Sequence, residues 1–109
     1  MNKSELKSRT KKFALRIIKL VDELPNTKAG HTIGNQIIRS GTSIAANYRA
    51  ACRARSSAEF ISKLAIVEEE SDETLFWLEA DELTAIFTAA GKTAKANKNL
   101  KSSIKNPKS

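Results

Sequence analysis

The stretch that decides the fold is Arg39-Ser-Gly-Thr-Ser-Ile-Ala-Ala-Asn-Tyr-Arg-Ala-Ala-Cys-Arg-Ala-Arg-Ser-Ser-Ala-Glu-Phe60. It begins inside one predicted helix, turns at Arg55-Ser56 and opens the next helix. Ser56, followed three residues later by Glu59, is a capping box, a pattern that satisfies backbone N–H groups at a helix start. The stretch therefore predicts two antiparallel helices joined by a short turn.

A helix is expected before this stretch, from about Ser4 to Leu24. Its apolar residues recur at steps of three and four, which is the helical period. Ser4 is its expected N-cap, and Pro25 ends it because the residue before a proline disfavours helical geometry.

The second predicted helix starts between Thr27 and Thr32 and reaches about Ala54. Gly34 and Gly41 each weaken a helix by about 1 kcal/mol relative to alanine. With the serines and alanines around them they leave little side-chain bulk, which favours close approach of a neighbouring helix.

A third helix should run without interruption from about Ser57 to Ala90. Glu79-Ala-Asp-Glu-Leu83 contains no glycine, proline or asparagine to break it. The alternative is a tight bend near Ala80-Asp81, with Asp81 as the N-cap of a fourth helix. Gly91 is the next expected break, so residues 1–91 form one helical domain and residues 92–109 a basic extension, either a frayed helix or a disordered tail.

The composition places the chain in one all-α domain that a partner chain would help to stabilise. No apolar run approaches the roughly 20 residues that cross a bilayer, and the first residues lack a signal peptide's apolar core. A single cysteine, Cys52, is consistent with a reducing cytoplasm.

Charge is segregated along the chain, whose net charge is +7. Residues 3–19 hold seven Lys or Arg, residues 92–108 hold six lysines, and residues 59–82 hold nine acidic residues and one lysine. Clustered cations favour contact with phosphate. The basic ends therefore predict nucleic-acid binding, and the residues expected to make it are Lys7, Arg9, Lys11, Lys12, Arg16, Lys92, Lys95 and Lys98. The alternative is that these Lys and Arg residues only form solvent-exposed helix faces and bind no ligand.

No catalytic constellation is found. His31 is the only histidine and is expected in an exposed loop without a neighbouring carboxylate. Cys52 lies among alanines and is interpreted as a small apolar residue. The sequence contains no phosphate-binding glycine loop, no metal-ligand spacing and no nucleophile elbow of the hydrolase type. It therefore predicts neither enzymatic activity nor a cofactor.

The cations of the second helix have a rival interpretation as partners of the acidic third helix. In an antiparallel hairpin Arg53 comes level with Glu59, and Arg39 with Glu73. We therefore expect interhelix ion pairs that set the register. Asn47 is expected to make a hydrogen bond across the helices, near Glu68 or Ser71; the alternative is a position on the exposed surface of the helix.

Several motifs resemble one known family: Gly34-Asn-Gln-Ile-Ile-Arg-Ser-Gly-Thr-Ser43, Ser43-Ile-Ala-Ala-Asn47, Arg53, Ser56-Ser-Ala-Glu-Phe60, Leu64 and Phe76-Trp-Leu-Glu79. They resemble the four-helix-bundle proteins related to the 23S rRNA intervening-sequence proteins. The resemblance implies an antiparallel up-down bundle, a ring-like homopentamer with a basic surface, and no enzymatic activity. A related branch, the accessory proteins of diversity-generating retroelements, binds nucleic acid and a reverse transcriptase.

The chain departs from that family after Glu79. Members usually continue, turn through a glycine-containing loop and return with a fourth helix, whereas here Glu79 runs into Ala80-Asp-Glu-Leu-Thr-Ala-Ile-Phe87. About twenty family residues are absent, and Glu69-Glu70 replaces a frequent Gly-Ser pair. The predicted fold is therefore a bundle of four-helix type in which the last two helices are fused, so that the last segment extends outward or swaps into a neighbouring chain.

Two functions follow from these observations. The first is a homo-oligomeric, non-enzymatic protein that binds nucleic acid through its basic ends. The second is a structural or adaptor oligomer with a protein partner, because the third helix carries a wide apolar arc that predicts contacts on more than one side.

Overall fold

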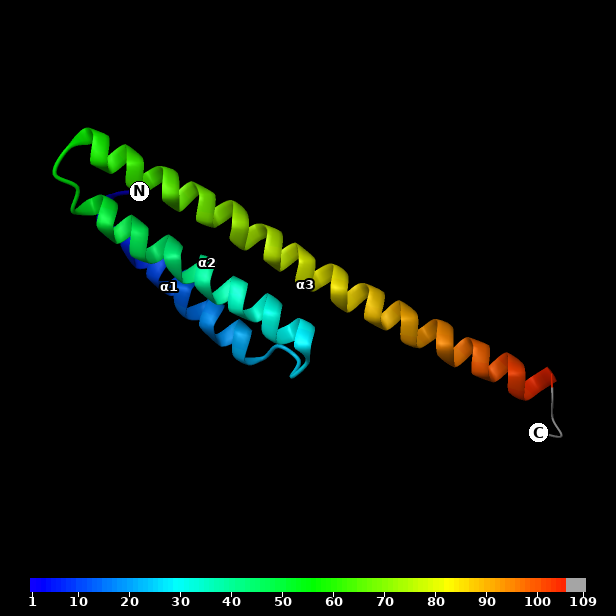
Figure 1. Ribbon diagram of the computed structural model, residues 1–109. Coiled ribbons are helices and arrows are strands. Elements are labelled where there is room, and N and C mark those ends of the chain that lie inside the picture. Colours follow the sequence, from blue (N-terminus) through cyan, green and yellow to red (C-terminus); the bar gives the residue numbers. More distant parts are fainter. Residues whose placement is uncertain (106–109) are drawn as a thin grey trace.

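Three helices in up-down-up order make up the computed structural model (Figure 1): α1 (Lys3–Asp22), α2 (Lys28–Cys52) and α3 (Ser57–Lys105). The structure describes the backbone of residues 1–105, and the side chains of residues 1–100 except Phe87 and Thr88. No strand occurs among the described residues. The predicted all-α fold is confirmed, and so is the fusion of the last two helices.

The first two helices begin at side-chain caps. Asn2, and not the expected Ser4, caps α1, because the Asn2 Oδ1 atom accepts the Glu5 backbone N–H at 2.8 Å. Thr27 caps α2 by accepting the Gly30 N–H at 3.0 Å. His31 therefore lies in the first turn of α2 and not in a loop, and it is exposed.

The contact between α1 and α2 depends on two glycines. A Cβ atom placed on Gly41 would lie 2.9 Å from Ile17 Cγ2, and one on Gly34 would lie 3.2 Å from Val21 Cγ1. The expected close approach is therefore present. Directly beside it, Ile17, Ile33 and Ile37 form the centre of the core.

The third helix passes through both sites where a break was considered. The Thr84 hydroxyl donates to the Ala80 carbonyl oxygen at 2.8 Å, which is a bond within one continuous helix. Asp81 is an interior residue of α3 and starts no new helix. The break expected at Gly91 is wrong, because this glycine keeps helical geometry and α3 continues to Lys105. The division into one helical domain, residues 1–91, and a basic extension, residues 92–109, stays a prediction, and residues 106–109 lie outside the described part.

Polar contacts set the register of α2 against α3. Arg39 forms an ion pair with Glu70 at 3.2 Å and a second one with Glu73. One residue further on, the buried Ser40 accepts a hydrogen bond from the buried Thr74, with 2.9 Å between the two hydroxyl oxygens. The expected Arg39–Glu73 contact is present, whereas the Ser40–Thr74 bond was not foreseen.

Two other expected contacts are wrong. Arg53 forms no ion pair with Glu59 in the described structure, because the Glu59 carboxylate accepts the Arg55 backbone N–H at 3.1 Å. Glu59 also donates its own N–H to Ser56 Oγ at 3.1 Å, which is one half of the predicted capping box, while its carboxylate bonds the Arg55 N–H in place of the Ser56 N–H. Asn47 donates to the Ser43 carbonyl oxygen at 2.9 Å, inside its own helix, and makes no bond to the described residues of α3.

The approach of α1 to α2 is tested by replacing Gly41 with alanine. The new methyl group meets the buried, branched Ile17, and such overpacking costs about 1–3 kcal/mol. Better helix propensity offsets about 1 kcal/mol of this. We expect Gly41→Ala to lower the free energy of unfolding by about 1 kcal/mol net in denaturant titrations.

Gly91→Ala is the matched control, since its Cβ meets nothing within 4 Å. It should raise helicity and leave the midpoint of unfolding unchanged or higher. Equal losses in the two variants would contradict the close approach.

The ion pair of Arg39 is tested through pH. A hydrogen bond from Arg39 lowers the pKa of Glu73, so the ionised carboxylate favours the folded state. This contribution is complete above the ordinary glutamate pKa of about 4.3 and is lost as pH falls through the lowered pKa. Glu73→Gln should therefore unfold at lower denaturant concentration than wild type at pH 7, and the difference should disappear as pH falls through the lowered pKa of Glu73.

Glu69→Gln serves as the control, because Glu69 is exposed and has no ion pair in the described structure. A Glu73→Gln difference that persists unchanged at low pH would rule out the ion pair as its source.

Candidate nucleic-acid interface

A hollow with a basic rim lies between α1 and α2. Lys7 and Lys11, one turn apart on α1, line it together with Arg49 of α2. Its volume is about 550 Å³, and Ala45 and Ala46 line it as well. The small side chains of these alanines leave the space that the three cations border.

A second hollow continues the first around the α2–α3 turn. It shares Ala46 and Arg49 with the first, and it is also lined by Arg53, Arg55, Lys63 and Glu59. The end of α2, the turn and the start of α3 thus bring three more cations beside the α1–α2 hollow.

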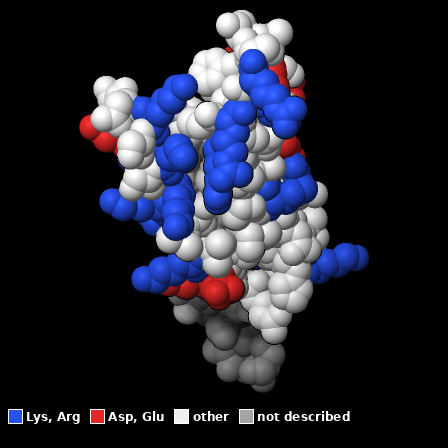
Figure 2. Space-filling model, turned by 90° about the vertical axis from the view of Figure 1, so that its left-hand side faces the viewer, with Lys and Arg blue, Asp and Glu red and all other residues white. Residues whose placement is uncertain are grey.

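These cations form one surface, which we call the basic face: Lys7, Lys11, Arg49, Arg53, Arg55 and Lys63. Figure 2 looks at this end of the molecule and shows Lys and Arg side chains over much of it, with few acidic atoms between them. Among the described residues only Arg39 forms ion pairs, so the basic face keeps its charge for a ligand.

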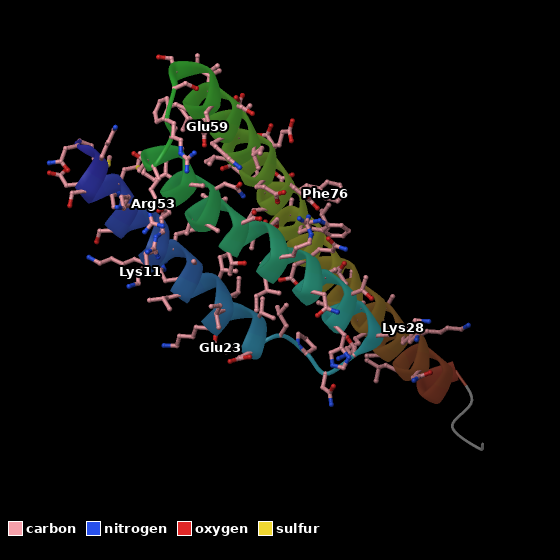
Figure 3. The ribbon with its side chains drawn as sticks, turned by 60° about the vertical axis from the view of Figure 1, so that its left-hand side comes forward. Lys11, Glu23, Lys28, Arg53, Glu59 and Phe76 are labelled. Carbon is pink, nitrogen blue, oxygen red and sulfur yellow. The ribbon has the colours of Figure 1, made fainter. Side chains whose placement is uncertain are left out.

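The elements of the basic face meet at one end of the bundle. Figure 3 shows Lys11 on α1, Arg53 at the end of α2 and Glu59 at the start of α3 towards this end. Glu23 and Lys28 lie at the other end of the α1–α2 hairpin. The charge is therefore concentrated where α2 turns into α3.

The residues assigned to nucleic acid from the sequence separate into three groups. Lys7 and Lys11 belong to the basic face. Arg9 and Arg16 line hollows on the other side of α1, next to Leu78 of α3. Lys12 is exposed on α1.

The third group, Lys92, Lys95 and Lys98, is exposed on the far half of α3. The molecule is 78 Å long, and Figure 1 shows this half pointing away from the α2–α3 turn. The structure therefore does not bring the two predicted basic ends together.

Arg55 and Lys63 were missed as members of this surface, whereas the arginines of the second helix, Arg49 included, were weighed between ion pairing with the third helix and phosphate binding. Antiparallel pairing about residues 23–27 predicts that α1 and α2 lie side by side, but symmetric pairing there places Lys7 level with Ser43. The packing seen in the structure brings Lys7 beside Arg49. The sequence pairs Arg53 with Glu59, but the Glu59 carboxylate bonds the Arg55 backbone N–H, so Arg53 has no ion pair in the described structure and belongs to the basic face.

Groups capable of other chemistry are isolated. No cluster of three His, Cys, Asp or Glu residues suited to a metal occurs in the described part of the chain. Cys52 is half-buried at the end of α2. Burial raises the pKa of Tyr48, and a hydrogen bond with Cys52 raises it further, so this phenol stays protonated. Within the same described part, no helix is long and apolar enough to cross a membrane.

The arrangement suits contact with phosphate more than with bases. Unpaired Lys and Arg side chains on an exposed surface bind phosphate oxygens without reading sequence. The exposed aromatic residue Phe76 lies on α3, away from Lys11 and Arg53 in Figure 3, and packs edge-on against Trp77 at 4.9 Å between ring centroids. The basic face therefore lacks an aromatic platform for stacking among its described residues.

Comparison with known proteins identifies one family. The family described as 23S rRNA-intervening sequence protein matches residues 2–105. A crystal structure of a protein of unknown function from the S23 ribosomal protein family of Bacteroides thetaiotaomicron is 43% identical to this chain, with a TM-score of 0.72. The match covers 77% of this chain and 75% of that one. No curated protein matches the sequence.

Proposed function

Since the chain belongs to the 23S rRNA-intervening sequence protein family, we propose that it is a non-enzymatic, homo-oligomeric protein that binds nucleic acid through its basic face. The family description concerns ribosomal RNA, which makes RNA the first ligand to test and DNA the second.

The observation that supports this proposal most directly is the unpaired charge of the basic face. Six cations from α1, α2 and α3 surround two joined hollows, and in the described structure none of them has a carboxylate within ion-pair distance. Folding has therefore gathered like charges that repel one another, and an anionic ligand would relieve that repulsion.

Binding of this kind gains free energy when phosphates displace the cations condensed around them. The logarithm of the binding constant then falls with the logarithm of salt concentration, by about 0.9 per phosphate contact on duplex DNA and about 0.7 on single strands. Bases contribute little, so affinity should vary only weakly with sequence.

A structural or adaptor role with a protein partner is the second candidate, and an apolar groove between α1 and α3 favours it. Phe13, Ile44, Leu75 and Leu78 are among the residues that line this groove. Purified protein that carries a protein partner and no nucleic acid, judged by gel and by its absorbance ratio, would favour this role.

The nucleic-acid proposal is tested with a triple variant, Lys7→Gln, Lys11→Gln and Arg49→Gln. Labelled RNA and DNA are titrated with wild type and variant at several salt concentrations. Removing three phosphate contacts should weaken binding to all sequences alike and make the salt slope shallower by about 2–3.

The matched control replaces Lys92, Lys95 and Lys98 with glutamine, which removes the same charge from the far half of α3. It should change the slope much less than the first variant. Equal effects of the two variants would show that net charge and not the basic face carries binding. Wild-type protein that fails to bind at low salt, or binds independently of salt, would contradict the function itself.

A further inference from the structure

The helices leave one apolar groove open along their length. α1 and α3 both run antiparallel to α2, and between them lies a hollow of about 530 Å³ with almost wholly apolar walls. Leu6 and Phe13 of α1 line one side, Leu75 and Leu78 of α3 the other, and Ile44 of α2 also lines it. A fourth antiparallel helix would bury these side chains, as in any up-down four-helix bundle.

The same chain carries an unpartnered helix of the right kind. Beyond about Ala80, α3 runs clear of α1 and α2 (Figure 1). Leu83, Ile86 and Leu100 on this half are 52%, 53% and 60% exposed. At 100° per residue they fall within about 100° of one another, on a stripe that continues from Leu75.

This half of α3 cannot reach the groove of its own chain. α3 is one continuous helix from Ser57 to Lys105, and its first half already forms a wall of the groove. The apolar stripe and the apolar groove can therefore meet only between two chains.

Charge determines the direction in which two chains fit. Residues 59–82 of α3 carry nine acidic residues and one lysine, whereas residues 83–109 carry six lysines and no acidic residue. Two α3 helices side by side and parallel would align like charges. When the two α3 helices are antiparallel, the acidic half of each lies beside the basic half of the other. Symmetry gives two such contacts in the pair.

We propose that two copies of this protein pair by exchanging the far halves of α3. In this arrangement residues 83–100 of each chain occupy the groove between α1 and α3 of the other, antiparallel to its α3. A two-fold axis passes near Ala80, so the contact is the same in both directions and closes at two chains. Each half of the dimer is then a complete four-helix bundle.

The dimensions and the register agree with this pairing. Residues 80–105 form about 39 Å of helix at about 1.5 Å per residue, which is enough to span the roughly 30 Å between residues 60 and 80. With the axis at Ala80, Lys92 of one chain comes level with Glu68 of the other, since both are twelve residues from Ala80. Glu79 of one chain comes level with Asp81 of the other, since each is one residue from Ala80. Glu79 is exposed and Asp81 half-buried, so this like-charge contact opposes the pairing and water screens it in part.

This inference rests on the homo-oligomeric part of the proposed function and is independent of nucleic-acid binding. Light scattering of nuclease-treated protein measures the mass directly. One chain has a mass of 12.0 kDa. The pairing requires twice that mass. A mass of five chains overturns the exchange and leaves a homo-oligomer, whereas a mass of one chain overturns both.

Leu83→Asp with Ile86→Asp tests which residues hold the pair. Both side chains are exposed within one chain, so the bundle should keep its helicity while the mass falls to that of one chain. The matched control is Leu15→Asp on α1, which is 58% exposed and absent from the groove lining, and it should stay dimeric. A Leu83→Asp, Ile86→Asp variant that keeps the wild-type mass would refute the exchange.

Disulfide trapping tests the antiparallel register. Ser71 lines the groove, Ala89 lies beside Leu100 on the stripe, and both are nine residues from Ala80, so Ser71→Cys and Ala89→Cys, made together with Cys52→Ala, should bridge between chains on mild oxidation. Within one chain they are about 27 Å apart along α3, beyond the roughly 7 Å that a disulfide spans. Trapped two-chain protein on a non-reducing gel is the expected result. Two-chain mass without trapping would contradict the antiparallel arrangement.

Discussion

The rest of the structure depends on the unbroken helical hydrogen bonding of α3 across residues 79–91. Nothing in Glu79-Ala-Asp-Glu-Leu83 offers the backbone an alternative partner, and Gly91 remains helical because no strained φ or tertiary contact draws it out. One helix of 49 residues results. It leaves three helices packed together and places half of the longest one outside them. Both the open groove and the exposed apolar stripe follow from this single continuity.

The packed part is held by two different contacts. Between α1 and α2, glycines allow the backbones to approach, and Ile17 fills the space against Gly41. Between α2 and α3, the buried Ser40–Thr74 hydrogen bond and the Arg39 ion pairs fix the axial register of the two helices. The first contact is nonpolar and sensitive to volume, whereas the second is polar and sets register. Together they place Arg49 and Arg53 beside α1 and the start of α3, which creates the basic face.

Helical periodicity and cap chemistry were sufficient to predict the three helices, their antiparallel order and the bond from the Glu59 N–H to Ser56 Oγ, which is one half of the capping box. They did not predict which partner a polar side chain selects. Glu59 had two partners within reach and took the backbone N–H, while Asn47 found the Ser43 carbonyl oxygen one turn away. Hydrogen bonds between residues close in sequence cost little conformational entropy, so they compete well with contacts between residues far apart in the chain. The basic face was only half predicted, because its residues come from three segments and only packing shows that they meet.

Charge segregation links the basic face to the open groove. Residues 1–58 carry twelve Lys or Arg and three acidic residues, a net charge of +9; residues 59–82 carry −8, and residues 83–109 carry +6. In a single extended chain these blocks act separately, and the acidic half of α3 lies beside the basic face and weakens its field. An antiparallel pair of α3 helices would place the net charge of −8 on residues 59–82 of one chain beside the +6 on residues 83–109 of the other. Most of both charges would then cancel. The field that remained would come from the α1–α2 hairpin, so pairing of the chains would strengthen the attraction of the basic face for an anionic polymer.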